Sequence, residues 1–296
     1  MKPDVASRTA EYAASFRALE SVRRPSRSRL FEDPLAIRFL APGRRRLVRL
    51  AGLPLFGAVV RAWVERRWPG AMTSGIARTR LIDDWLRQAL QDGISQVLLL
   101  GAGFDCRAYR LRELEHCRVV EVDHPATQAV KREHVVRALG RLPEHVTFVG
   151  ADLTREDSRR VLGATGLDAR ERVVVLWEGV THYLGEAAVD ATLRALADTS
   201  AHDSRVVFTY LHRGLLDGTA EFEGARASVE QVAGDGEPWI WGMEPERMPA
   251  YLAERGLQLL EDVGAEEYRV RYWGERGRRM RGFTFYRVAM AQVRGT

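Results

Sequence analysis

Two glycines directly follow a short apolar run, at a place where a cofactor could bind. The run Gln96 to Leu100 is typical of a buried strand, and Gly101-Ala102-Gly103 comes next, just before a predicted helix. Open α/β sheets bind ligands at the carboxyl ends of their strands, and glycine there lets the backbone approach a ligand closely. The third glycine of the dinucleotide fingerprint is missing, since Arg107 lies near its place. The pattern predicts cofactor binding by Gly101 and Gly103, argues against a nicotinamide dinucleotide, and leaves a plain tight turn as the alternative.

Acidic residues end the next two predicted strands. The run Val119 to Asp123 places Glu121 and Asp123 on one face of a strand, and Asp123 is nearer its carboxyl end. A carboxylate there can accept hydrogen bonds from both hydroxyls of an adenosine ribose, which makes Asp123 the better candidate and Glu121 the second. The following strand leads into Asp152 and Leu153, which suit an adenine amino group and the face of its ring. Asp152 is also a candidate N-cap for a helix from Arg155.

The fourth strand, Arg172 to Trp177, runs into Glu178 and the polar stretch Thr181-His182-Tyr183. Four consecutive strands therefore end in residues suited to binding a ligand: the glycines after the first strand and polar side chains after the next three. The carboxyl ends of parallel strands meet at one edge of a sheet, so these residues are predicted to share one site.

Short β-rich runs alternate with amphipathic stretches from Ser95 onward, a pattern that predicts a parallel sheet covered by helices. Two late strand candidates bring the expected sheet to about seven strands. The expected strands are QVLLL, CRVVEV, VTFVG, RVVVLW, RVVFTYL, Leu257 to Val263 and Phe283 to Ala291. The expected helices are Arg8 to Glu20, Asp33 to Leu40, Arg44 to Arg67, Ser74 to Gln91, Asp105 to Glu115, Pro125 to Gly140, Arg155 to Leu162, Glu186 to Thr199 and Glu244 to Arg255.

Composition excludes several classes of protein. The 296 residues are 46% hydrophobic and 29% charged, as in ordinary globular proteins and unlike disordered chains. Two cysteines, Cys106 and Cys117, are too few for a disulfide framework or a four-ligand zinc site. Residues 1–90 carry 18 Lys and Arg against 8 Asp and Glu, a basic surface that would attract nucleic acid, anionic lipid or an acidic small molecule. Without an aromatic-interleaved or helix-turn-helix pattern, a solvated basic face is the preferred interpretation.

Several sequence motifs, taken together, resemble those of one protein family. TAEYAASFRALES, LFEDPLA, ARTRLIDDWL, LLLGAGFDCRAYRL, VVEVDHP, ADL and WEGVTHYL, between about residues 8 and 211, are similar to the leucine carboxyl methyltransferase family. The resemblance is to its bacterial, actinobacterial branch of S-adenosylmethionine-dependent O-methyltransferases, which includes polyketide-tailoring members. It implies a class I, Rossmann-like methyltransferase fold: a mostly parallel seven-stranded sheet, an N-terminal helical cap and a lid insertion after the fifth strand.

The resemblance also implies roles for residues. Arg78 would hold the methionine carboxylate of S-adenosylmethionine, with Arg80 as a nearby substitute, and Gly101 and Gly103 would line the methionine moiety. Asp123 would bind the ribose, Asp152 and Leu153 the adenine, and Glu178 would lie near the amine or the sulfonium. An arginine suits the first role because its planar fork matches a carboxylate.

The catalytic candidates are His182 and Tyr183, as a general base and a substrate-positioning hydroxyl, and His212 after the fifth strand could also face the methyl group. A carboxylate acceptor is ionised at neutral pH and needs no base, whereas a hydroxyl gains from one. No metal is required. Phe222, Trp239 and Trp241 suggest an aromatic wall for a planar or apolar acceptor. The stretch Thr181-His182 is commonly apolar in the bacterial branch, which suggests a polar substrate pocket here.

The expected organisation is a helical cap over residues 1–90 and a cofactor-binding core over 91–296, with a lid at about 212–243. The predicted activity is O-methylation of a carboxyl or hydroxyl oxygen of a small, secondary-metabolite-like acceptor. Alternatives are a protein or peptide carboxyl methyltransferase, a nicotinamide-dependent oxidoreductase and a non-catalytic binding module. The first 16 residues do not have the pattern of a secretory signal, so a cytoplasmic location is expected, with no nucleic-acid partner and no membrane span.

Overall fold

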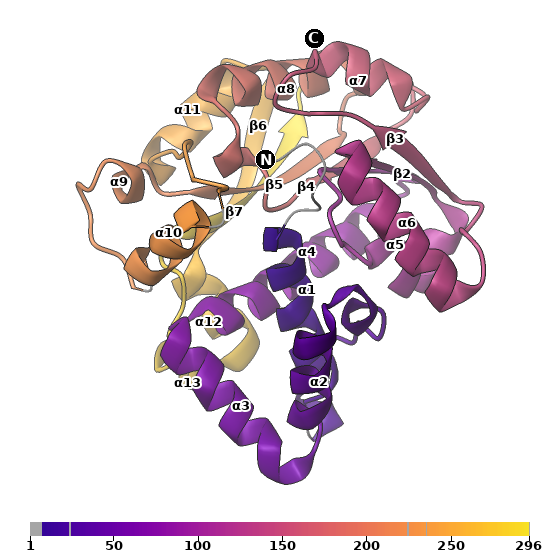
Figure 1. Ribbon diagram of the computed structural model, residues 1–296. Coiled ribbons are helices and arrows are strands. Elements are labelled where there is room, and N and C mark those ends of the chain that lie inside the picture. The colour runs from indigo at the N-terminus through magenta and orange to yellow at the C-terminus, as the bar shows by residue number, and fades with distance from the viewer. Residues whose placement is uncertain (1–7, 24, 224, 235, 296) are drawn as a thin grey trace.

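The computed structural model describes residues 8–23, 25–223, 225–234 and 236–295. Its centre is one seven-stranded sheet with the order β3-β2-β1-β4-β5-β7-β6 (Figure 1). Strands β1 to β5 run parallel and β7 pairs antiparallel with β5 and β6. The chain order reverses at β1, which pairs with β2 on one side and β4 on the other. The strands are β1 (Gln96–Leu100), β2 (Arg118–Asp123), β3 (Val146–Gly150), β4 (Val173–Trp177), β5 (Arg205–Leu211), β6 (Leu257–Val263) and β7 (Tyr286–Val293).

Helices cover both faces of this sheet, as the apolar runs of the strands require. Leu98 and Leu100 of β1 pack into one core, and Val97 and Leu99 pack into the other, because successive side chains of a strand point to opposite faces. The first face is covered by α7 (Ser158–Ala164), α8 (Glu186–Thr199) and α11 (Met248–Ala253). The second is covered by α4 (Ala71–Gln91), α5 (Arg107–Arg110) and α12 (Ala265–Trp273).

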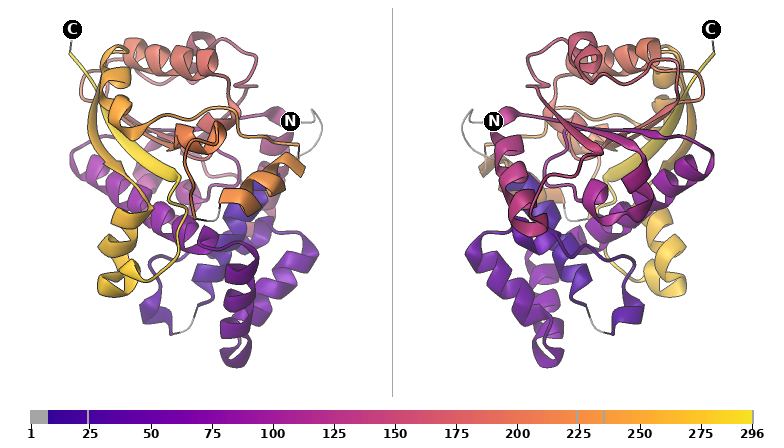
Figure 2. Two further views of the ribbon diagram at one scale, coloured as in Figure 1. Left: turned by 90° about the vertical axis from the view of Figure 1, so that its left-hand side faces the viewer. Right: turned by 90° about the vertical axis from the view of Figure 1, so that its right-hand side faces the viewer.

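The N-terminal helices form a third apolar cluster beside the sheet. It joins α1 (Arg8–Ser21), α2 (Pro42–Ala51) and α3 (Pro54–Arg67) to α6 (Pro125–Leu139) and includes Phe104 after β1. Figure 2 shows these helices below the sheet, on the side away from the C-terminus. The remaining helical segments are α9 (Arg213–Leu216), α10 (Ala225–Gly234), α13 (Glu275–Arg278), η1 (Ser26–Ser28), η2 (Ala36–Phe39), η3 (Arg112–His116), η4 (Thr181–Tyr183) and η5 (Pro245–Arg247).

The mostly parallel seven-stranded fold is confirmed, but several predicted helices are wrong in extent. The predicted helix Arg44 to Arg67 is two helices, since the chain turns at Gly52 and restarts at Pro54, which suits a first helical position. Asp33 to Leu40 holds only the short turn η2, while Asp33 is buried and its carboxylate caps Ala36. Asp105 to Glu115 is divided between α5 and η3. Arg155 to Leu162 is shifted to α7, which begins and ends later, and Glu244 to Arg255 is shortened to η5 with α11.

The C-terminal part contains two helices that the sequence analysis missed. α12 begins after Gly264, whose amide is capped by the Glu267 carboxylate, and it packs against α4. The last strand, Tyr286–Val293, begins three residues after the predicted start at Phe283. The division into a cap (1–90), a core (91–296) and a lid (about 212–243) stays a prediction, and residues 1–7, 24, 224, 235 and 296 of those segments lie outside the described part.

Candidate active site

A cavity of about 570 Å³ lies at the carboxyl ends of β1 to β4. This is the edge at which open α/β sheets bind ligands, and the volume suits a drug-sized molecule. Side chains of α1, together with Ser228, Val232 and residues 236–240, complete its wall. The cavity brings together nine of the predicted site residues: Arg78, Gly101, Gly103, Asp123, Asp152, Leu153, Glu178, His182 and Tyr183.

The turn after β1 requires glycine on steric grounds. Gly101 has a φ of +72°, and a Cβ built on it would lie 2.4 Å from a methyl carbon of Val180. Gly103 has a φ of +42°, and its amide donates a hydrogen bond to the Asp123 carboxylate. Positive φ and close approach are both costly for any residue with a Cβ. The turn therefore brings bare backbone to the cavity wall.

Asp123 is the carboxylate that β2 contributes to the cavity. Its Oδ1 accepts a hydrogen bond from the His124 amide at 2.6 Å, and its Oδ2 accepts from Gly103. Burial raises the pKa of Asp123 although both amides favour the charged form. Glu121, the alternative on the same strand face, is fully buried and lies 2.7 Å from the Lys131 ammonium, outside the cavity lining. Of the two acids, only Asp123 therefore lines the cavity.

Asp152 and Leu153 line the cavity together after β3. Oδ1 of Asp152 accepts hydrogen bonds from the amide and the hydroxyl of Thr154, at 3.0 and 2.6 Å. Although burial opposes this effect, these bonds lower the pKa of Asp152. The predicted N-cap role of Asp152 is wrong, because α7 begins at Ser158 and Asp157 caps it through the Arg160 amide.

Glu178, at the end of β4, is held between two arginines. Its Oε1 accepts from Arg78 Nε at 3.0 Å, and its Oε2 accepts from an Arg107 terminal nitrogen at 2.8 Å. Burial raises the pKa of Glu178, but the two guanidinium groups outweigh it and hold the pKa below its ordinary value. Arg78 also lies 4.2 Å over the Tyr286 ring. Arg80, the possible substitute for Arg78, instead pairs with Asp84 at 2.8 Å, outside the cavity lining.

His182 lies deep in the wall beside Tyr183. It is 2% exposed, its ring meets those of Trp239 and Tyr286 edge to face, and its Nδ1 has no hydrogen-bond partner within the described chain. Burial, with Arg78 nearby, lowers the pKa of His182 to about 3, so the imidazole is neutral at physiological pH. Burial raises the pKa of Tyr183, so its hydroxyl keeps its proton. The pair offers neutral hydrogen-bonding groups to a molecule in the cavity.

The leucine carboxyl methyltransferase family model matches residues 10–197. A protein of Streptomyces coelicolor named as an S-adenosyl-L-methionine-dependent methyltransferase is 34% identical over 258 residues, which cover 84% of this chain and 86% of that protein. This chain belongs to the leucine carboxyl methyltransferase family. It is an S-adenosylmethionine-dependent methyltransferase, which decides against the oxidoreductase alternative.

Further similarities agree with the family assignment. A Streptomyces avermitilis protein with the same kind of name is 36% identical over 240 residues, covering 79% of this methyltransferase and 81% of its own chain. The crystal structure of a methyltransferase from Thermobifida fusca superposes with a TM-score of 0.60 at 18% identity, covering 96% of this chain and 94% of that one. A DUF574 family protein from Streptomyces avermitilis superposes at 0.57 and 16% identity, covering 94% and 97%. The two structures support the fold.

Three predicted features of the methyltransferase do not reach the cavity. His212 does not face it, since its Nδ1 accepts from the Gly214 amide at 3.0 Å and its ring packs against Phe222. Trp241 is 2% exposed in the core on the α8 side of the sheet. Of the three predicted aromatic residues only Trp239 lines the cavity, because the Phe222 ring packs against His212 and Phe285 and Trp241 is buried in the core.

Part of the cavity wall comes from segments that the sequence patterns did not mark as site-forming. Tyr12, Phe16 and Arg17 reach the cavity from α1, Trp68 from the end of α3, and Tyr286 from the start of β7. The α1 residues lie inside TAEYAASFRALES, one of the motifs that resemble the family, and this motif was the sequence feature that could have placed them in the site. Tyr286 had none, since its place next to Arg78 depends on the pairing of β7 with β5. Among the described residues, no group of three or more His, Cys, Asp or Glu is arranged to hold a metal ion.

Burial of His182 should make the stability of the methyltransferase depend on pH. Its pKa is about 3 when folded and near 6.5 when unfolded, so only the unfolded chain takes up the proton between these values. The free energy of unfolding should therefore fall as pH decreases below 6.5, with about 2 kcal/mol of the loss at pH 5 due to this group. Urea denaturation measures the free energy of unfolding at pH 7 and pH 5. The decrease between the two pH values should be about 2 kcal/mol larger in the wild type than in His182→Gln. The exposed control His202→Gln should behave as the wild type; equal losses in all three proteins would contradict the assignment.

Proposed function

We propose that the enzyme transfers a methyl group from S-adenosylmethionine to a carboxyl or hydroxyl oxygen of a small, secondary-metabolite-like acceptor. The observation that carries the proposal is that the residues after strands β1 to β4 share one cavity with His182 and Tyr183. These residues are Gly101, Asp123, Asp152 and Glu178. One cavity with cofactor-binding candidates and a polar end suits a reaction in which two molecules must meet in line.

The residues present fit the cofactor. Bare backbone at Gly101 and Gly103 allows close approach, and Asp123 presents a carboxylate to hydroxyl groups. We assign the ribose to Asp123, the adenine to Asp152 and Leu153, and the methionine end to Arg78, Gly101, Gly103 and Glu178. When bound, S-adenosylmethionine supplies an electrophilic methyl group on a positively charged sulfur. Glu178 stays ionised because two arginines hold its pKa down, and its charge suits a cationic ligand.

The acceptor would lie against the aromatic part of the wall. Phe16, Trp68, Tyr183, Trp239 and Phe283 supply flat apolar surfaces that suit a planar or apolar molecule. The protein's main contribution is alignment, for which good orientation supplies on the order of 7 to 11 kcal/mol of the barrier.

His182 and Tyr183 are proposed to position the accepting oxygen. A neutral imidazole with a pKa of about 3 is a weak base for a phenol, whose pKa is near 10. Its unpartnered Nδ1 is buried, so it would reach the acceptor only after the neighbouring side chains move, and the Tyr183 hydroxyl is the proposed direct contact. An acceptor carboxylate, already ionised at neutral pH, needs no base, so these groups favour a carboxyl oxygen over an ordinary hydroxyl.

The cytoplasmic location and the absence of a metal requirement stay predictions.

Calorimetric titration tests the first half of the proposal. S-adenosylmethionine should bind saturably, whereas NAD and NADP should not bind. Transfer of a labelled methyl group to a panel of aromatic carboxylic acids, phenols and carboxyl-terminal peptides then tests the second half. We expect methyl esters of small carboxylic acids as the main products. Absence of S-adenosylmethionine binding would reject the cofactor site, and products formed only on peptides would reject the small-molecule acceptor.

A further inference from the structure

The outer side of the α2–α3 hairpin carries five exposed apolar side chains, which we call the hairpin ridge. They are 45 to 64% exposed and make up half of the ten large apolar side chains exposed in the described chain. Three of them, Phe56, Val59 and Trp63, follow the helical spacing i, i+3, i+7 and share one face of α3. The residues of the ridge are Leu50, Leu53, Phe56, Val59 and Trp63.

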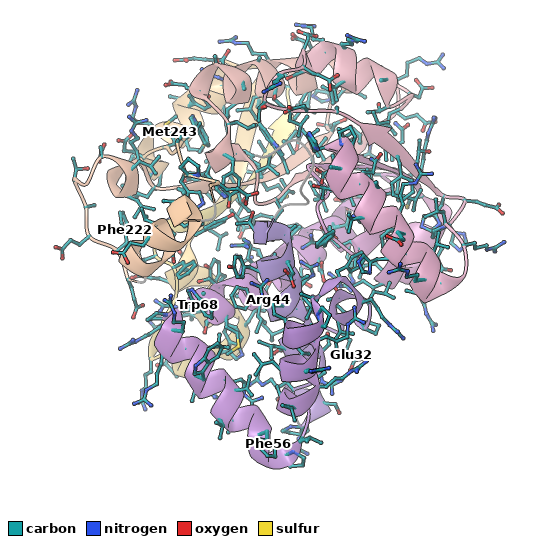
Figure 3. The ribbon with its side chains drawn as sticks, in the orientation of Figure 1. Glu32, Arg44, Phe56, Trp68, Phe222 and Met243 are labelled. Atoms are coloured by element: carbon teal, nitrogen blue, oxygen red, sulfur yellow. The ribbon has the colours of Figure 1, made fainter. Side chains whose placement is uncertain are left out.

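The side chains of the ridge belong to none of the hydrophobic clusters of the described chain. α3 packs on the rest of the N-terminal helices through Val60 and Val64, which are buried in the cluster around α1. The hairpin projects away from the sheet in Figures 1 and 2, and Phe56 lies at its far end in Figure 3. Exposed apolar side chains gathered on one helix face are typical of an interaction site.

The ridge is bordered by arginines. Residues 42–67 contain seven arginines and one acidic residue, Glu65, whose carboxylate accepts from the Gly70 amide at 2.9 Å. Arg46, Arg49 and Arg66 are exposed and form no ion pair with the residues that the structure describes. The hairpin therefore combines an apolar row with uncompensated positive charge.

We propose that the hairpin ridge docks on the surface of an anionic lipid bilayer. Leucine, phenylalanine and tryptophan side chains enter the boundary between headgroups and acyl chains, while arginines beside them pair with anionic headgroups. A second copy of this chain fits less well, because it would bring two strongly positive hairpins together. The docking is peripheral, since no described helix is long and apolar enough to cross a membrane.

The ridge also adjoins the cavity. Trp63, at its end, meets Trp68 edge to face with ring centres 5.8 Å apart, and Trp68 lines the cavity. Docking would thus place one cavity wall beside the lipid, where an amphiphilic acceptor collects. This link to the acceptor rests on the proposed function, whereas the docking itself does not.

Vesicle flotation tests the docking. The protein should float with vesicles of equal parts phosphatidylglycerol and phosphatidylcholine, and remain unbound with phosphatidylcholine alone. Because salt screens exposed charges, raising the salt from about 50 to 300 mM should weaken binding severalfold. Absence of binding, or equal binding to both kinds of vesicle, would overturn the proposal.

Two variants and a matched control separate the contributions of the surface. Leu53→Ser/Phe56→Ser/Val59→Ser and, separately, Arg46→Ser/Arg49→Ser should each weaken binding to anionic vesicles at least tenfold. Val136→Ser/Leu139→Ser changes two apolar side chains on α6 that are 41 and 43% exposed, and should bind as the wild type. An equal loss in this control would overturn the proposal.

Two further measurements on the triple variant keep the outcomes distinct. Its S-adenosylmethionine affinity and thermal midpoint should match the wild type, so a failure of vesicle binding is distinguishable from a failure of the cofactor site or of folding. If light scattering shows a dimer that the triple variant loses, and vesicles are not bound, the ridge is a self-association surface and the lipid proposal is rejected.

Discussion

Replacing Arg107 by Met is expected to lower the free energy of unfolding by about 3–5 kcal/mol, the usual cost of removing one partner from a buried ion pair. Arg107 is 2% exposed and serves three carboxylates. Its Nε donates to Asp83 at 2.7 Å, and its terminal nitrogen donates to Glu178 at 2.8 Å and to Asp105. Methionine fills similar space without charge, so these acids would remain in low dielectric without their shared cation.

Urea denaturation at pH 7 measures this effect, and the chain offers a matched control. Arg170 makes the same kind of contact with Asp168, at 2.9 Å, but is 89% exposed. Arg170→Met should leave the denaturation midpoint unchanged within error, because water already solvates both charges. If Arg107→Met were as stable as Arg170→Met, the buried network would not be a major source of stability.

Replacing Asp123 by Ala is expected to weaken S-adenosylmethionine binding at least tenfold while leaving the fold intact. Hydrogen bonds to a charged group contribute about 1.5–3 kcal/mol, and a ribose held by this carboxylate would lose them. The substitution also frees the amides of Gly103 and His124, which now donate to the carboxylate. Calorimetric titration of the variant measures the affinity directly.

Two controls make the Asp123 result specific. Asp198→Ala removes a carboxylate that is 49% exposed on α8, and should bind the cofactor as the wild type does. Circular dichroism of Asp123→Ala should retain the wild-type spectrum and thermal midpoint. Unchanged affinity in a folded Asp123→Ala protein would remove this residue from the proposed site.

The strands of the sheet were predictable because buried parallel strands are short continuous apolar runs. Gln96–Leu100 is found with the predicted bounds, and Asp123, Gly150 and Trp177 end their strands where expected. Helix extents were not predictable to the same degree. An apolar pattern continues across Gly52 and Pro54, so it cannot show where one helix becomes two.

The sequence by itself determined which residues end the parallel strands, and therefore that Gly101, Asp123, Asp152 and Glu178 meet at one edge. This follows from local patterns, since in a parallel sheet every strand presents its carboxyl end to the same side. Only the tertiary structure decided which neighbouring groups share the cavity. It buried Glu121 against Lys131, turned His212 away, and brought Tyr12, Trp68 and Tyr286 to the wall. The physical reason is that these placements depend on contacts between segments far apart in the chain, which no local periodicity encodes.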